Sequence, residues 1–368
     1  MGLTSYWYNE DKGIYQRSIA SCTVVISVNI LASIVLIEVL IDYSEIYENV
    51  EERHRLMVIM SSFKYLQGVL LLNTVWHLLR QDKKYTDLKW HIERLEEQSR
   101  KHFSKSQDIE KKFKFLAYLK YSIMLYLYGS VLITSYTLMS PQRNLWMWVI
   151  LKTFLHTNQQ YLTYLILYQY FQLFWKSNRM YAYIERQVGL LANEASDELP
   201  SLIRVKLSWL MELHSKFGSD LRDLELLFKS AIFQCRYNIN LYNIIAVYYV
   251  YLFSVYIKDA VAFLGLVVAT YFCNHLDLYL NDNMTDITKQ HFENLNINLR
   301  LFNGVRNSAA KLNRECEEFA IYLCNRKLNL KLSGALNMDR KSWFNMMSRL
   351  VMYSIILIQS HINIDRHK

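Results

Sequence analysis

The sequence predicts an all-α membrane protein with seven transmembrane helices. Seven mostly apolar stretches each have the roughly 20 residues that a helix needs to cross the hydrocarbon core of a bilayer. These stretches are 19–41, 56–79, 115–139, 145–175, 232–257, 260–280 and 343–362. The chain of 368 residues contains only two prolines and nine glycines. This composition favours long helices over a β-sandwich, a β-barrel or a disordered chain.

The distribution of positive charge sets the predicted orientation of these spans. With a cytosolic N-terminus, most of the 42 lysines and arginines fall in cytosolic segments, including a compact block at 80–114. Seven crossings then leave the C-terminus outside the cell. An ordinary G-protein-coupled receptor has an extracellular N-terminus, so this orientation excludes that class. The net charge of +9 follows the span ends, which favours contact with anionic inner-leaflet lipid over nucleic acid.

The extracellular connections are short in this orientation. They are 42–55, 140–144 and 258–259, which leaves no room for a globular ligand-binding domain. Any ligand must therefore bind among the helices. The first apolar run has full span length and follows a polar start, which predicts a retained signal anchor and not a cleavable signal peptide.

The cytosolic segments are long, charged and helical in pattern. We expect 80–114 to extend the second span toward the third, and the fourth helix to continue to 191. Apolar residues recur every three or four positions from Leu202 to Phe228, which predicts an amphipathic helix ending at Ala231. A less regular helical pattern covers 283–340, with a break expected at Gly334. The predicted regions are six transmembrane helices with cytosolic extensions in 1–282, anchor helices in 283–342, and a pore-lining last span with a short extracellular tail in 343–368.

The end of the last span carries the most specific motif. Tyr353 is followed by five mostly apolar residues and then by Gln359. This spacing resembles the C-terminal signature of insect gustatory receptors, which is Thr-Tyr, five mostly apolar residues, then Gln-Phe. Met352 replaces the Thr and Ser360 replaces the Phe. Sugar-sensing members carry Glu directly after the Tyr where this chain has Ser354, so the resemblance argues against a sugar ligand.

The resemblance implies a ligand-gated, non-selective cation channel of four subunits in the plasma membrane of chemosensory neurons. The implied partners are a small-molecule tastant, sister subunits in a homo- or hetero-tetramer, membrane lipids and cations. Two alternatives stay open, namely an odorant receptor subunit of the same superfamily that acts with a co-receptor, and a secondary transporter. A transporter would usually show inverted repeats and spans broken by glycine or proline, and the sequence shows no such repeat.

The candidate pore residues lie on one face of the last span. Helical periodicity places Ile355 or Ile356 a turn below Gln359, and Ile362 or Asn363 a turn above it. An apolar ring can hold a pore shut by dewetting, and a polar side chain suits a water-lined channel. The alternative for Gln359 is a hydrogen bond between packed helices. The pore and gate candidates are Tyr353, Ile355, Ile356, Gln359, Ile362 and Asn363.

Polar side chains within the other spans predict a ligand pocket. Lys152 and His156 lie on one face of the fourth span, as part of either an aqueous cavity wall or a buried hydrogen-bond network. Lysines in a cavity would favour a ligand rich in hydrogen-bond acceptors, although either Lys64 or Lys152 could instead pair with Glu38 or snorkel outward. Tyrosines offer an aromatic wall with a polar tip. The ligand-binding candidates are Lys64, Tyr128, Lys152, His156 and Tyr249.

The remaining ionisable residues and the cysteines point to structure and not to enzyme chemistry. Lys120, Arg236, Arg349, Glu38 and Asp277 lie near span ends, where we expect them to snorkel or to meet headgroup water. The five cysteines show no metal-binding spacing and no extracellular pair, so we expect buried or cytosolic thiols. No nucleotide-binding or nucleophile motif is present, and we expect no cofactor, no metal and no enzyme activity.

Overall fold

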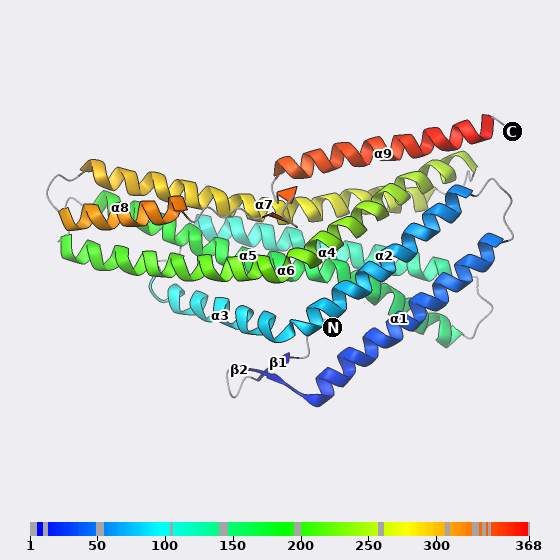
Figure 1. Cartoon of the computed structure of the whole chain (residues 1–368), viewed down its shortest axis with the longest axis horizontal. Helices are drawn as coiled ribbons and strands as arrows, with labels where there is room; N and C mark the ends of the chain where they lie inside the picture. Colours follow the sequence, from blue (N-terminus) through cyan, green and yellow to red (C-terminus); the bar gives the residue numbers. More distant parts are fainter. Residues whose placement is uncertain are drawn as a thin grey trace.

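The computed structural model describes residues 6–9, 14–48, 55–103, 106–139, 146–194, 200–256, 261–305, 310–325, 331–332, 336–337 and 340–366. These residues form long helices and two small strand pairs (Figure 1). The helices are α1 (Ile19–Glu48), α2 (Arg55–Arg80), α3 (Asp82–Arg100), α4 (Gln107–Met139), α5 (Trp146–Glu194), α6 (Pro200–Tyr256), α7 (Val261–Val305), α8 (Ala310–Asn325) and α9 (Arg340–Arg366). Strands β1 (Tyr6–Asn9) and β2 (Ile14–Arg17) pair antiparallel, as do β3 (Lys331–Leu332) and β4 (Leu336–Asn337). The predicted all-α class is confirmed, with these short ribbons as additions.

Three long helices run through the centre of an elongated bundle. Helices α5, α6 and α7 contain 49, 57 and 45 residues. At 1.5 Å per residue, each is about 70 Å long or longer, which is more than twice the roughly 30 Å hydrocarbon core of a bilayer. Helices α1, α2 and α9 lie at one end of the bundle, and α3 and α8 lie at the other (Figure 1).

We call the end with α3 and α8 the anchor half. It also contains residues 176–194 of α5, 200–231 of α6 and 283–305 of α7. We call the end with α1, α2, the spans of α4 to α7 and α9 the membrane half. The β1–β2 ribbon contacts α3, so the start of the described chain lies beside the anchor half. Helix α9 ends at the opposite extreme of the bundle (Figure 1).

The predicted helix boundaries inside α6 and α7 are wrong. The amphipathic pattern was expected to end at Ala231, but α6 continues without interruption into the fifth span. Helix α7 likewise joins the sixth span to the segment after it. Residues 219–256 and 266–303 contain no glycine or proline, so no helix breaker interrupts either rod. The break expected at Gly334 lies outside the described residues.

The second predicted span and the charged segment after it do not form one straight helix. A turn at Gln81 separates α2 from α3, and α4 begins at Gln107. The amphipathic pattern of α6 also holds only in part. Leu202 and Val205 are 47% and 66% exposed, whereas Phe217 and Phe228 are almost completely buried. The buried face of α6 already includes Ile203 and Leu207, which are 0% and 1% exposed, so Leu202 and Val205 lie outside it.

The anchor half has the core of a soluble helical protein. Its largest buried side chains are aromatic, among them Tyr181, Phe217, Phe228 and Phe319. The Tyr85 and Phe228 rings meet edge to face, with centroids 5.6 Å apart. Such aromatic burial supplies a large share of the hydrophobic free energy of a helical bundle.

The membrane half instead exposes large apolar side chains. Ile34 on α1, Phe115 and Tyr118 on α4, and Ile150 on α5 are 54%, 66%, 71% and 60% exposed. Soluble monomers rarely expose contiguous apolar surface on this scale, which is the surface that lipid covers in a membrane protein. By length and composition alone, one helix among the described residues, Gln107–Ile133, is apolar enough to cross a membrane, and Ile19–Leu31 is a shorter apolar helix.

Candidate functional site

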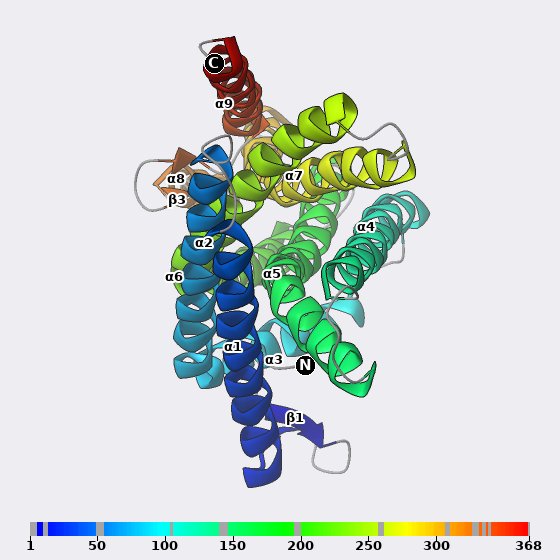
Figure 2. The same ribbon diagram turned by 90° about the vertical axis from the view of Figure 1, so that its right-hand side faces the viewer.

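Helix α7 carries a buried polar stripe, and this stripe organises the candidate site. Its members recur every three or four residues, so they lie along one side of the helix. Each of them is 0% exposed: Asn274, Asp277, Asn281, Asp282, Thr285 and Thr288. Helix α7 contacts α4, α5, α6 and α9. Seen end-on, it lies between α4 on one side and α9 on the other (Figure 2).

An ion pair joins α4 to α7 inside the membrane half. The Lys120 Nζ lies 2.5 Å from the Asp277 Oδ1, and both side chains are completely buried. The Lys120 Nζ also lies 5.4 Å from the centroid of the Phe171 ring. The expectation that Lys120 and Asp277 snorkel separately to headgroup water is therefore wrong. The two charges lie opposite each other on adjacent helices, and pairing offsets part of the cost of removing both from water.

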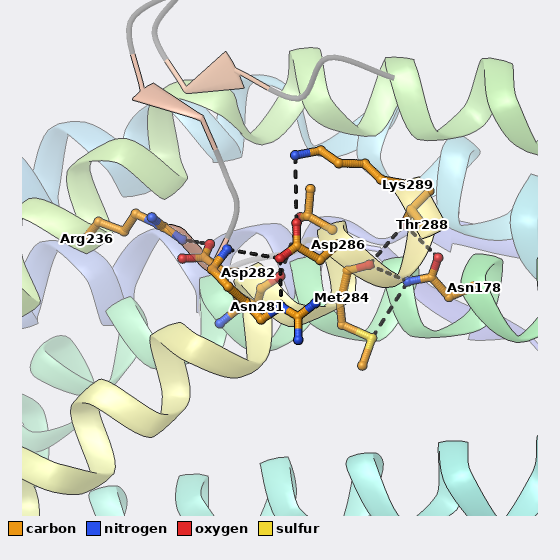
Figure 3. Close-up of polar contacts among 10 residues, drawn as sticks. Asn178, Arg236, Asn281, Asp282, Met284, Asp286, Thr288 and Lys289 are labelled. Carbon is orange, nitrogen blue, oxygen red and sulfur yellow. Dashed lines mark hydrogen bonds and ion pairs between the residues drawn. The ribbon is translucent and has the colours of Figure 1, made fainter. Parts of the chain in front are cut away.

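A second set of polar contacts continues along α7 toward the anchor half (Figure 3). Arg236 of α6 forms an ion pair with Asp282, which corrects the expectation that Arg236 would snorkel. The Asn178 Nδ2 of α5 donates to the Met284 carbonyl oxygen at 2.7 Å, and the Thr288 hydroxyl donates to the Asn178 Oδ1 at 2.6 Å. These contacts tie α5 and α6 to α7 where the three rods leave the membrane half.

The first turns of α9 are held on α7 by several different contacts. The Asp286 Oδ2 accepts the Arg340 backbone N–H and its Nε–H, each at 3.0 Å, so Asp286 caps the N-terminus of α9 from another helix. This hydrogen bond to Asp286 raises the pKa of the Arg340 guanidinium. The Trp343 Nε1–H donates to the His275 carbonyl oxygen at 3.2 Å. The Trp343 ring also meets the Tyr279 ring edge to face at 5.3 Å.

Tyrosines and asparagines form a hydrogen-bonded chain between α5, α6 and α7. The Tyr164 hydroxyl donates to the Asn274 Oδ1 at 2.8 Å, and the Asn274 Nδ2 donates to the Asn243 Oδ1 at 2.9 Å. The Asn243 Nδ2 lies 3.2 Å from the His275 Nε2. The Tyr164 ring lies 6.0 Å from that of Tyr161, which contacts α4. This chain therefore begins at aromatic rings of the membrane half and ends beside α9.

The structure describes the side chains of only two of the five predicted ligand-binding residues. Tyr128 is partly buried, and its ring meets that of Tyr161 edge to face at 4.9 Å. Lys152 is 2% exposed, with its Nζ 5.6 Å from the centroid of the Trp148 ring. The side chains of Lys64, His156 and Tyr249 lie outside the described set. Convergence of the five residues on one pocket therefore stays a prediction.

Sequence reasoning missed the residues that the structure links most clearly. Tyr164, Asn243, Asn274 and His275 were not predicted as site residues, although each is buried and hydrogen-bonded. The available signal was the spacing of polar residues within the sixth span, from Asn274 through Asp277 to Asn281. Such a polar stripe in a transmembrane segment marks the side that faces other helices.

The predicted pore residues lie on a largely uncovered face of α9. Tyr353, Ile355 and Ile356 are 50%, 48% and 49% exposed, and Gln359 and Asn363 are exposed as well. Ile362 is partly buried. Gln359 is thus not enclosed between packed helices of its own chain. Helix α9 contacts α6 and α7 along one side, mainly near its first turns (Figures 1 and 2).

A groove of the anchor half lies between α3 and α6, away from the stripe on α7. It has a volume of about 570 Å³, and its lining includes Lys84, Asp87, His91, Asp220 and Asp223. The His91 Nδ1 lies 2.8 Å from the Asp220 Oδ1. Burial raises the pKa of Asp220, and the contact with His91 acts in the opposite direction. Among the described residues, no cluster of three or more histidines, cysteines or carboxylates is arranged to hold a metal ion.

The cysteines that the structure describes are free thiols. Cys235 is buried, and Cys22 and Cys273 are partly buried. The side chains of Cys316 and Cys324 lie outside the described set.

Comparison with known proteins gives one consistent family. A family model described as the 7tm chemosensory receptor matches residues 1–364. The chain is 26% identical over 118 residues to the Drosophila melanogaster gustatory receptor for bitter taste 22e, and 24% identical over 152 residues to the putative gustatory receptor 22d of that species. These matches cover 32% and 41% of this chain, and only 30% and 38% of the two relatives.

The fold is similar to that of a solved insect receptor. The structure of the olfactory receptor OR5 from Machilis hrabei, in complex with eugenol, aligns with a TM-score of 0.60. The alignment covers 92% of this chain and 88% of that one, at 12% sequence identity. At this identity the likeness concerns the fold alone.

Proposed function

Because this chain belongs to the 7tm chemosensory receptor family, we propose that it is a ligand-gated, non-selective cation channel opened by a small-molecule tastant. The family assignment makes it a membrane receptor and not an enzyme. The tastant is an organic compound other than a sugar, since Ser354 stands where sugar-sensing members carry Glu. The similarity to a receptor for bitter taste supports a bitter compound. The channel acts in the plasma membrane of chemosensory neurons.

The exposed face of α9 is the observation that carries this proposal. Ile355 and Ile356 are about half exposed in a single chain, and Gln359 lies a turn further on. Within a single chain, this helix exposes both apolar and polar side chains. Such a helix becomes more stable when it packs around a common axis with copies of itself. Four chains then place four α9 helices around a central pore, with Gln359 facing water and the isoleucines forming a dewetted gate. The N-terminus is cytosolic and the C-terminus extracellular.

The ligand binds between helices in the outer part of the membrane half. Tyr128 and Tyr161 offer two aromatic rings that meet edge to face at 4.9 Å between centroids, and buried Lys152 offers a charge for an acceptor-rich ligand. Lys64, His156 and Tyr249 complete the proposed pocket. OR5 was solved with eugenol, a small phenol. A ligand of that size and chemistry suits aromatic walls with polar tips.

The test is electrical recording from cells that express this chain alone. Calcium influx and single-channel currents are measured during exposure to quinine, caffeine and eugenol, with G-protein signalling blocked. We expect evoked cation currents under that block. Gln359→Ala and Ile362→Ala should alter conductance, selectivity or resting leak. Ser348→Ala is the matched control, because this exposed α9 hydroxyl donates only to the Phe344 carbonyl oxygen one turn earlier. Unchanged currents in both pore variants would mean that α9 does not line the pore.

A second candidate function is that of an odorant receptor subunit that acts with a co-receptor. The fold similarity to an insect olfactory receptor favours it as the alternative. The same cells decide between the two, because a subunit of this kind gives no current alone and gains one when a co-receptor is expressed with it. A current from this chain alone excludes the dependence on a co-receptor.

A further inference from the structure

We propose that Tyr164, Asn274, Asn243, His275 and Trp343 form a relay that couples the ligand pocket to the pore helix α9. The inference rests on the proposed channel function and adds positioning residues to it. The five residues belong to α5, α7, α6, α7 and α9, so one chain of contacts joins four helices. None of the five was among the pocket or pore residues that the sequence predicted.

The relay begins at the aromatic rings of the proposed pocket. Tyr128 contacts Tyr161 at 4.9 Å between ring centroids, and Tyr161 contacts Tyr164 at 6.0 Å. A ligand that displaces either of the first two rings changes the packing around Tyr164. The Tyr164 hydroxyl is the donor that passes this change to α7 through Asn274.

The three hydrogen bonds between side chains, from Tyr164 through Asn274 and Asn243 to His275, run in the same direction. The Asn274 Oδ1 accepts from Tyr164, which leaves its Nδ2 to donate to the Asn243 Oδ1. The Asn243 Nδ2 must then donate to the His275 Nε2, so His275 is neutral in this arrangement with its proton on Nδ1. Hydrogen bonds that run head to tail polarise one another, particularly in a site from which water is excluded. Asn274 and Asn243 are both 0% exposed, so losing one bond leaves a buried polar group without its partner.

The relay ends on the backbone that holds α9. The His275 carbonyl oxygen accepts the Trp343 Nε1–H at 3.2 Å. Nearby, the Asn240 Nδ2 of α6 lies 3.1 Å from the Met346 Sδ of α9. A shift of α7 at His275 therefore directly changes the position of the first turns of α9. The ion pairs Lys120–Asp277 and Arg236–Asp282 fasten α4 and α6 to α7, but neither includes a residue of α9.

The test is a double-mutant cycle between the two ends of the relay. Tyr164→Phe removes only the first hydroxyl, and Trp343→Phe removes the last N–H while keeping an aromatic ring against Tyr279. Single-channel recordings in planar bilayers give the resting open probability without ligand, and the response to quinine and to eugenol. We expect each single variant to change the open-to-shut ratio about three- to tenfold, the size of one net hydrogen bond. The double variant should change it no more than the larger single variant.

The matched control is a tyrosine that bonds to α7 outside the relay. The Tyr126 hydroxyl of α4 donates to the Leu266 carbonyl oxygen at 3.4 Å. When Tyr126→Phe and Trp343→Phe are combined, their separate effects on the open-to-shut ratio should multiply. Where Trp343→Phe fails to reach the membrane, Asn243→Ser paired with Tyr164→Phe tests the part of the relay between α5 and α6, and additive effects there would likewise overturn it.

Two results would overturn the relay. The effects of Tyr164→Phe and Trp343→Phe could multiply like independent changes, or the control cycle could show the same non-additivity. A parent chain with no current at rest or with either probe would overturn the channel function itself, and the relay with it. The recordings thus separate failure of the relay from failure of the proposed function.

Discussion

The membrane half and the anchor half differ in what they bury and in what they expose. The anchor half buries phenylalanines such as Phe217 and exposes charged side chains such as Lys216. The membrane half exposes Phe115 and buries Lys120 and Asp277. Both arrangements follow from one rule, because each half turns toward its surroundings the side chains that the surroundings solvate. Helices α5, α6 and α7 run through both halves. Each therefore exposes charged side chains in the anchor half and apolar side chains in the membrane half.

The strongest test of this contrast compares one residue type in the two halves. Phe217→Ala removes a ring that is 0% exposed in the anchor core and should lower the free energy of unfolding by about 3 to 5 kcal/mol. Phe115→Ala removes a ring that is 66% exposed on α4, and in lipid or detergent it should cost far less. Thermal unfolding of the two purified variants in detergent measures the difference. Equal losses would contradict the division into two halves.

Breaking the buried ion pair of the membrane half should cause the second largest loss of stability. Asp277→Ala leaves Lys120 buried without its partner and should cost about 3 kcal/mol. We expect the lower end of the usual range, because the chain unfolded in a membrane also finds polar partners. Replacing both residues, as Lys120→Met with Asp277→Leu, should recover most of the loss. The control is Lys216→Ala, which breaks an exposed pair with Glu212 in the anchor half and should change the unfolding midpoint little. No recovery in the double variant would mean that the pair is required for more than charge balance.

The cap on α9 lies between the two halves and should have a smaller effect. Asp286→Ala removes the acceptor of the Arg340 backbone N–H and should destabilise the first turn of α9 by about 1 kcal/mol. Asp286→Asn keeps an acceptor oxygen but loses the charge, so its effect should be smaller. Hydrogen exchange at the first turn of α9 measures both variants. A larger effect for the Asn variant would show that the capping geometry is not what holds α9.

The smallest expected effect is a pH dependence confined to the anchor half. Burial raises the pKa of Asp220 in the folded chain above its ordinary value of 3.8. This group therefore adds stability below about pH 4, and that stability is lost as pH rises through the folded pKa. Asp220→Asn should accordingly gain stability relative to the parent as pH increases above 4, by less than about 1 kcal/mol because the contact with His91 opposes the effect of burial and solvent screens this half-exposed partner. Unfolding midpoints measured from pH 4 to 7 give the trend, and a difference independent of pH would contradict it.

The sequence was sufficient for the fold class because apolar length is a local property. Hydropathy and charge predicted the spans, and the fourth helix was expected to continue to 191, where α5 in fact runs to Glu194. The continuity of α6 and α7 was not predicted, because a change from an amphipathic to an apolar pattern resembles a break when the helix in fact continues. The absence of glycine and proline there was the better guide.

The pairing of buried polar residues could not be predicted in the same way. Lys120 and Asp277 are separated by 157 positions, and no local pattern indicates that they meet. A charge near a span end was therefore assigned to headgroup water, which is its usual partner. The same limitation concealed the contact between Tyr164 and Asn274, which lie 110 positions apart.

The uninterrupted course of α6 and α7 has a mechanical consequence. A sharp kink in a helix almost always lies at a proline, a glycine or another interruption of the hydrogen-bond ladder, and residues 219–256 and 266–303 contain neither glycine nor proline. Each rod therefore acts as a lever whose pivot is the tightly packed anchor half. A tilt of about 2° about that pivot moves a point roughly 30 Å away, across the hydrocarbon core, by about 1 Å. Displacements too small to disturb the packing of the anchor are thus enlarged at the outer ends of the rods.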